Sequence, residues 1–275
     1  MNKLASLIIT TKNEEGVLRK LLQSIEKQTY KRKEVILVDN NSIDNTVRIA
    51  KKMGAKIFKF GPERSAQRNY GVKKAKGEYI LILDADMELT ANVVKEGVKI
   101  LNNDKKIAAL MIPEKSHAFS FWEKVKAFER TFYNKKGDSF TDAARFFNKN
   151  IFLKMKGYDE NITGPEDWDL TERIRSSGYK IERTQGFIYH RERIKSLFEL
   201  AKKKFYYAHD VHKYLKKHKK SLISPKTVYF LRPVFYKNPN KIITHPVFSI
   251  GLIIMLSIEF IAGGLGYFIG RIKSK

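Results

Sequence analysis

The sequence predicts an α/β fold in which a mostly parallel sheet carries helices on both faces. Two observations support this fold class. Short apolar segments rich in β-branched residues recur through the first hundred residues. Between them lie segments whose apolar residues return every three or four positions, as on one face of a helix. Strands that alternate with helices in this way form parallel sheets covered on both sides.

Each element follows from its own residues. Residues 6–11 and 34–39 are apolar runs typical of buried strands, and a helical pattern opens after the first of them. The polar turn at residues 40–44 is suited to cap a helix that begins near Asn45. Gly77 and Gly178 follow helical patterns and are expected as helix C-caps. The remaining predicted strands cover residues 56–60, 79–84, 107–112, 143–148 and 187–190, and the remaining helices cover residues 65–76, 91–101, 119–133 and 166–177.

Composition limits the class of protein. A chain of 275 residues buries one sizeable core, with room for an appendage. The absence of cysteine excludes disulfides and thiolate chemistry. The chain has 54 Lys and Arg against 29 Asp and Glu, a net charge of +25, which attracts nucleic acid, anionic lipid or phosphorylated substrates. The excess is concentrated in residues 195–241, where apolar side chains interrupt the lysines, so we expect a basic amphipathic segment on an anionic membrane surface.

The C-terminus predicts a membrane-spanning helix. Residues 247–269 are almost wholly apolar, and Glu259 is their only charged residue. A carboxylate is costly in lipid, so we expect Glu259 to face protein, the interface or a partner. Two alternatives stay open: a buried core helix, and two shorter helices that dip into the bilayer around the glycines near residue 264. Basic residues flank both ends, at Lys241, Arg271, Lys273 and Lys275.

The segment that carries most chemistry is Gly77 to Asp86, in which an apolar strand delivers Asp84 and Asp86 to its C-terminal end. In open α/β sheets, ligands bind at that end of the strands. Two neighbouring carboxylates do not both ionise cheaply unless a cation is present. Mg²⁺ is typically held by one or two carboxylates together with substrate phosphates. The pair therefore predicts a divalent ion that carries a nucleotide diphosphate.

Other polar segments are expected at the same edge of the sheet. Residues 10–14 follow the first strand, Asp39 ends the second, and Arg68 lies on the helix before the acidic strand. A further acidic segment, residues 164–170, lies about eighty residues beyond Asp86.

With these motifs in order, the sequence resembles the family 2 glycosyltransferases of the GT-A fold, from about residue 4 to residue 190. The motifs are residues 6–15, 38–44, 67–71, 77–86, 157–160 and 166–170. The resemblance implies a nucleoside pocket lined by Thr10, Lys12, Glu14 and Asp39.

The resemblance also implies roles at the diphosphate. Arg68 would approach it with a cation, and the alternative for Arg68 is an ion pair with a surface acid. Asp84 would face the ribose or a metal-bound water. Asp86 would hold Mg²⁺ or Mn²⁺ directly, and His190, at the end of a predicted strand, is either a further ligand of the metal or a structural residue.

The acidic segment supplies the implied catalytic group. Asp167 would be the general base that deprotonates the acceptor, with Glu166 as the fallback, although both residues also suit the N-terminus of a helix. Trp168 would offer a flat face to a sugar ring or lipid head group. A base opposite the leaving group implies inversion at the anomeric carbon.

The predicted protein is thus a metal-dependent inverting glycosyltransferase that uses a UDP- or GDP-sugar and a glycan or lipid-linked acceptor. We expect a single-pass anchor in the cell membrane, a cytoplasmic catalytic domain and no nucleic-acid partner. The predicted domains are residues 1–194, 195–241 and 242–275. Three alternatives stay open: a polyprenyl-phosphate sugar synthase, a nucleotidyltransferase, and a basic nucleic-acid-binding protein.

Overall fold

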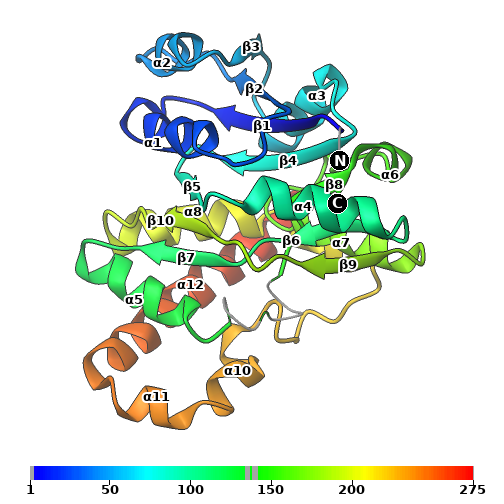
Figure 1. The fold of residues 1–275 in the computed structure, drawn as a ribbon. Coiled ribbons are helices and arrows are strands. Elements are labelled where there is room, and N and C mark those ends of the chain that lie inside the picture. Colours follow the sequence, from blue (N-terminus) through cyan, green and yellow to red (C-terminus); the bar gives the residue numbers. More distant parts are fainter. Residues whose placement is uncertain (1–2, 134–136, 138–141, 275) are drawn as a thin grey trace. The chain divides into compact units, whose positions relative to one another are not determined.

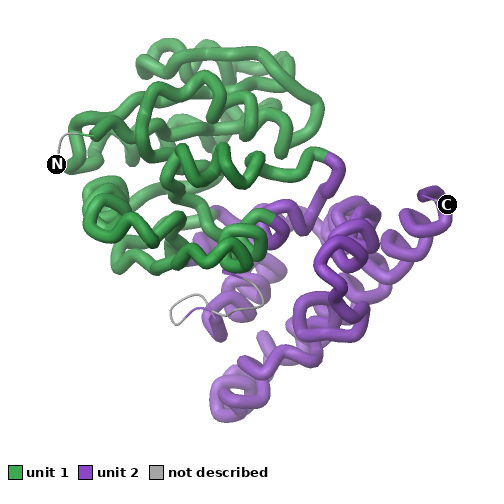
Figure 2. Tube along the Cα trace, turned by 90° about the vertical axis from the view of Figure 1, so that its right-hand side faces the viewer, with its two compact units in different colours: residues 1–114, 143–160, 170–190 green, residues 115–142, 161–169, 191–275 purple. Residues whose placement is uncertain are grey.

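The computed structural model describes residues 3–133, 137 and 142–274, and Lys275 lies outside them. The chain forms two compact units, which Figure 2 draws in different colours. Unit 1 comprises residues 1–114, 143–160 and 170–190, and unit 2 comprises residues 115–142, 161–169 and 191–275. The predicted three-part domain division is functional rather than based on compactness, so it stays a prediction.

Unit 1 is built on a seven-stranded sheet of order β3-β2-β1-β4-β8-β6-β9 (Figure 1). All neighbouring pairs are parallel except those of β8, which runs antiparallel to β4 and β6. A mostly parallel sheet therefore confirms the predicted fold class. The strands are β1 (Ala5–Thr11), β2 (Lys33–Asp39), β3 (Lys56–Lys59), β4 (Tyr79–Asp84), β6 (Ile107–Met111), β8 (Phe146–Asn148) and β9 (Lys180–Arg183).

The strand register gathers predicted site residues at one edge. Thr11 in β1 pairs with Asp39 in β2, and Thr10 pairs with Asp84 in β4. Because these three strands are parallel, their last residues lie together at the carboxyl edge. Beyond that edge, β5 (Met87–Leu89) pairs antiparallel with β10 (Ile188–Arg191), so that His190 faces Met87 across the ladder.

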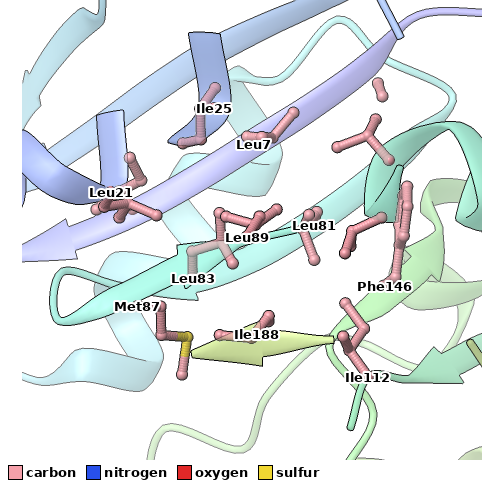
Figure 3. Close-up of a cluster of buried hydrophobic side chains, with 14 of the residues drawn as sticks. Leu7, Leu21, Ile25, Leu81, Leu83, Met87, Leu89, Ile112, Phe146 and Ile188 are labelled. Atoms are coloured by element: carbon pink, nitrogen blue, oxygen red, sulfur yellow. The ribbon is translucent and has the colours of Figure 1, made fainter. Parts of the chain in front are cut away.

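Alternation along the buried strands supplies two apolar layers. In β1, Leu7 and Ile9 point to one side and Ile8 to the other. The first layer packs against α1 (Glu15–Glu26), α2 (Thr46–Lys52) and α4 (Val93–Asn103), and Figure 3 shows part of it around Leu7, Leu21 and Leu81. The second layer packs against α3 (Arg64–Lys74), α6 (Lys149–Lys154) and the end of α7 (Glu166–Ser176). Helices thus cover both faces, as predicted.

Two glycines test the predicted helix ends. Gly178 has φ +81° just after α7, which confirms a left-handed C-cap. The prediction for Gly77 is wrong, because α3 already ends at Lys74 with Ala75 extended. A Cβ on Gly77 would lie 2.7 Å from the backbone nitrogen of Ser6, so glycine is required there for the close approach of β1.

Unit 2 is mostly helical. Residues 246–273 form one continuous helix, α12, which rules against two shorter helices. The basic segment folds into short helices rather than one long one. The further elements with residues in unit 2 are β7 (Glu114–His117), α5 (Phe121–Arg130), α8 (Leu197–Ala208), α9 (Val211–Lys217), the 3₁₀ turn η1 (Tyr229–Leu231), α10 (Pro233–Tyr236), α11 (Pro239–Ile243) and α12 (Pro246–Lys273).

Candidate active site

The loops after β1 and β2 are held together by Asp39. Its buried carboxylate accepts a hydrogen bond from the Thr11 hydroxyl at 2.8 Å. It also accepts the backbone N–H of Ser42 at 2.8 Å and the Ser42 hydroxyl at 2.5 Å. Asn13, in the left-handed region at φ +55°, donates its backbone N–H to Ser42. Asp39 therefore orders the loop that adjoins Thr10, Lys12 and Glu14, and its role toward a base stays a prediction.

Three consecutive polar residues of α3 each bind a different part of unit 1. The Gln67 amide donates to the Val38 carbonyl at 2.9 Å, at the end of β2. The Arg68 guanidinium binds the Asp84 carboxylate, with Nη2 to Oδ1 at 2.9 Å. The Asn69 side chain donates to the Tyr158 carbonyl at 2.9 Å and accepts the Tyr158 N–H at 2.9 Å. The buried polar face of α3 thus holds two strand ends and the segment after α6 in position.

Asp84 lies between two arginines. Its second oxygen, Oδ2, is 3.2 Å from Nη1 of Arg145, which comes from the segment just before β8. Burial alone would raise the pKa of Asp84, but the guanidinium groups of Arg68 and Arg145 outweigh it and hold that pKa well below its usual range. Arg68 is only 1% exposed, so the cation predicted for the diphosphate is bound to Asp84 here. Asp84 is a stable anion fixed at the edge of the sheet.

A chain of polar contacts continues from Arg145 to Asp86. Nε of Arg145 lies 3.1 Å from Oε1 of Glu114, and Oε2 of Glu114 lies 2.8 Å from Nδ1 of His190. The other ring nitrogen of His190, Nε2, is 3.4 Å from Oδ1 of Asp86. Glu114, His190 and Asp86 are each about one-sixth exposed. The structure therefore joins Arg68, Asp84, Asp86 and His190, all predicted from the sequence, into one network.

Asp86 and His190 are the two side chains of this network that would share a divalent cation. A histidine that binds a metal almost always donates its second ring N–H to a carboxylate or carbonyl. Glu114 occupies that position at Nδ1, and Nε2, on the other side of the ring, faces Asp86. Within residues 3–133, 137 and 142–274, no group of three or more His, Asp or Glu side chains is placed to hold a metal ion. Mg²⁺ and Mn²⁺ bind carboxylate oxygens together with water and substrate phosphates, so either ion needs few protein ligands.

The predicted base segment opens α7 in unit 2. Glu166 is buried at 1% exposure, whereas Asp167 and Trp168 are half-buried. Asp169 is fully buried and binds Nε2 of His218 at 2.8 Å and Nζ of Lys217 at 2.9 Å.

The environment of Trp168 in unit 2 is aromatic and basic. Its ring lies 6.2 Å from that of Tyr214, and Nζ of Lys226 sits 5.2 Å from its centre. Trp168 therefore lies among aromatic and basic side chains of unit 2.

Sequence reasoning missed Glu114 and Arg145. One signal for Arg145 was available, since it is the only charge between Ala143-Ala144 and Phe146-Phe147. A lone charge in a buried segment needs a partner. Glu114 follows Pro113 at the end of a predicted strand and carries no comparable signal, because its partners are 31 and 76 residues away.

Comparison with known proteins supplies a family. The model of glycosyl transferase family 2 matches residues 6–158, which is more than half of the chain. A protein of Rickettsia typhi named as a glycosyltransferase is 32% identical over 186 residues, which cover 61% of this chain and 57% of that protein. Another, of Methanocaldococcus jannaschii, is 26% identical over 256 residues, or 85% of this chain and 86% of that protein. The match thus spans little more than half of the Rickettsia protein.

Solved structures share the fold. Mannosyltransferase PcManGT of Pyrobaculum calidifontis, in complex with GDP-Man and Mn²⁺, is 17% identical with a TM-score of 0.58, over 92% of this chain and 74% of that one. S. aureus TarS 1–349 in complex with UDP-GlcNAc is also 17% identical, with a TM-score of 0.55, over 90% of this chain and 79% of that one. At this identity the likeness concerns the fold alone.

Proposed function

Because the chain belongs to glycosyl transferase family 2 and has the GT-A fold, we propose that it moves one sugar from a nucleotide-sugar donor to an acceptor hydroxyl. The observation that carries the proposal is the charge network at the carboxyl edge of the sheet, from Arg68 through Asp84, Arg145, Glu114 and His190 to Asp86. Ligands of α/β sheets bind at this edge, which supports a role of the network toward the donor and its metal ion.

The donor is assigned to the carboxyl edge of unit 1. Thr10, Lys12, Glu14 and Asp39 are proposed to surround the nucleoside, with a UDP- or GDP-sugar as the donor class. Asp86 and His190 would hold Mg²⁺ or Mn²⁺, and Asp84 would orient a ligand water of the ion or the ribose. The ion supplies Lewis-acid neutralisation of the charge that develops on the departing diphosphate.

The acceptor is assigned to the start of α7. Asp167 takes the proton from the acceptor hydroxyl as its oxygen bonds to the anomeric carbon. The bond from that carbon to the diphosphate oxygen breaks, and the nucleoside diphosphate leaves. We assign the base to Asp167 rather than Glu166, because the half-buried carboxylate of Asp167 is reachable and that of Glu166 is almost fully buried. Attack opposite the leaving group inverts the anomeric configuration.

The C-terminal helix supports the proposed acceptor class. α12 is long and apolar enough to cross a membrane. We propose that it keeps the enzyme at the cytoplasmic face of the cell membrane, where nucleotide sugars and lipid-linked acceptors meet. A glycan carried on a lipid, or a lipid-linked sugar, is then the acceptor, and Trp168 packs on its sugar ring.

The test is a donor screen that measures release of nucleoside diphosphate with and without Mn²⁺. Wild type is compared with Asp86→Ala, with Asp167→Asn and with the control Asp104→Asn, a surface acid paired with Lys180. We expect Asp86→Ala to lose metal-dependent turnover, Asp167→Asn to keep donor binding but lose transfer, and the control to match wild type. Full transfer by Asp167→Asn would overturn the base assignment, and release of pyrophosphate would indicate a nucleotidyltransferase instead.

A further inference from the structure

Exposed large apolar side chains are unevenly distributed between the two units. Unit 1 has three of them among its described residues, Ile43, Phe60 and Leu153, and all the others belong to unit 2. Seven line one side of α12 at spacings of three, four or seven positions, and each is between 44% and 71% exposed. We call these seven the α12 ridge: Val247, Ile250, Ile254, Ile261, Leu265, Phe268 and Ile272. An apolar strip of this length indicates an interaction surface.

The opposite side of α12 packs on other helices of unit 2. We call this packing of α12 on α5 and α8 the seat of α12. A Cβ on Gly266 would lie 2.2 Å from the carbonyl oxygen of Phe205, and one on Gly270 would lie 2.0 Å from that of His209. No side chain fits at either position, so α8 and the residue after it run directly alongside the C-terminal half of α12. The N-terminal half packs on α5, where a Cβ on Gly251 would lie 2.7 Å from Val125.

Glu259, in the middle of α12, is part of the same seat. Its carboxylate lies 3.2 Å from Nζ of Lys126 in α5 and 3.3 Å from Nζ of Lys204 in α8. The expectation that Glu259 faces protein is therefore confirmed. Two ammonium groups neutralise a carboxylate that would be costly in lipid. Detaching α12 from α5 and α8 would leave all three charges without these partners, so the helix is expected to stay seated.

The seat limits how α12 meets a bilayer. Lys202 and Lys203 are exposed on α8, beside the half of α12 that contains Gly266. If α12 crossed the membrane while seated, α8 would carry these lysines into the hydrocarbon, where charged side chains are costly. If α12 lies in the plane of the interface, its ridge reaches the acyl chains while the lysines stay among the head groups.

The net positive charge of residues 191–275 indicates which lipids this region binds. Residues 191–275 hold 18 Lys and Arg against 4 Asp and Glu. Each basic residue near an anionic bilayer surface adds attraction that a neutral surface does not provide. A strip that is apolar along its length and flanked by cations matches an anionic phospholipid surface.

We propose that α12 is an in-plane membrane anchor: it stays seated on α5 and α8 and inserts its ridge into one leaflet of an anionic bilayer. Length and composition also suit a single-pass helix, and the two arrangements differ in where the end of α12 lies. This inference concerns attachment and does not depend on the transfer reaction.

Single-cysteine labelling distinguishes the two arrangements, because the chain has no cysteine of its own. Asn240→Cys precedes α12, Ser274→Cys follows it, and Lys105→Cys reports the side on which unit 1 lies; all three positions are exposed. The full chain is expressed in a bacterium, and an impermeant maleimide is added to inverted vesicles and to spheroplasts. An in-plane helix labels all three positions from the same side. Labelling of Ser274→Cys from the side opposite Lys105→Cys would overturn the proposal.

Vesicle binding tests the ridge itself. The full chain is mixed with vesicles of phosphatidylglycerol and phosphatidylcholine, or of phosphatidylcholine alone, and bound protein is measured by sedimentation. The double variant Ile261→Lys/Leu265→Lys is expected to bind the anionic vesicles about tenfold more weakly than wild type. The matched control Ile43→Lys, in unit 1 and 93% exposed, should bind as wild type does. Equal binding by wild type and the double variant would refute the proposal, as would a double variant that loses only self-association.

Discussion

Replacing Glu114 by glutamine tests whether the charge network prepares His190 for a metal. Glu114 accepts from Nδ1 of His190 at 2.8 Å and from Nε of Arg145 at 3.1 Å, one with each carboxylate oxygen. Glutamine keeps the shape but has only one acceptor oxygen, so one of the two charge-assisted hydrogen bonds is lost. A hydrogen bond to a charged group contributes about 1.5–3 kcal/mol. Loss of such a partner of a metal-binding histidine typically weakens metal affinity by about 10–100-fold.

We therefore expect Glu114→Gln to raise the Kd for Mn²⁺ by about 10–100-fold, which is equivalent to about 1.4–2.7 kcal/mol. The assay is calorimetric titration of the full chain with Mn²⁺ in the presence of UDP or GDP. The matched control is Glu34→Gln, because Glu34 also accepts from charged and polar partners, Lys56 and Ser6, but near the start of β2. If Glu114→Gln binds Mn²⁺ as wild type does while Asp86→Ala does not bind it, Glu114 does not prepare His190 for the metal.

Two further substitutions test the fold that supports the site. Asp84→Asn removes the charge between two arginines and should lower the free energy of unfolding by about 3 kcal/mol, as measured by urea titration near neutral pH. Because the folded pKa of Asp84 lies well below its unfolded value of about 3.9, this difference is fully present above that value and shrinks as the pH falls toward the folded pKa; a difference that grows on acidification would contradict it. Gly77→Ala, which places a Cβ against β1, should destabilise unit 1 by about 1–3 kcal/mol. Gly16→Ala, in α1 with open space around it, should be neutral or stabilising by up to about 1 kcal/mol, and equal effects of the two substitutions would argue against the close approach.

Much of unit 1 is predictable from local pattern. The segments that became β1, β2 and β4 are contiguous apolar runs, and a strand buried on both faces has that pattern wherever it occurs. Their polar last residues predict the edge at which Asp39 and Asp84 lie, since parallel strands end together. The same reasoning placed Asp86 near that edge, and the network confirms its proximity to His190.

What the sequence missed depends on contacts between distant segments. The strands β5, β7 and β9 are three or four residues long, too short for a period of two to be distinguished from a loop. The residues before Gly77 in the sequence predict a helix cap at this position. Only the close packing of β1 against Gly77 shows why glycine is there. Likewise, the hydropathy of α12 does not predict that the helix packs on α5 and α8, because the partners of Glu259 lie on those two helices.

We propose that Asp86 and its network bind a divalent ion that carries a nucleotide sugar. The most direct measurement is calorimetric binding of UDP- and GDP-sugars to the full chain, with Mn²⁺ and with a chelator, for wild type and Asp86→Ala. We predict that Mn²⁺ tightens binding of one donor class by about tenfold or more in wild type and has little effect in Asp86→Ala. If no nucleotide sugar binds to wild type more tightly with Mn²⁺ or Mg²⁺ than with chelator, the claim is wrong.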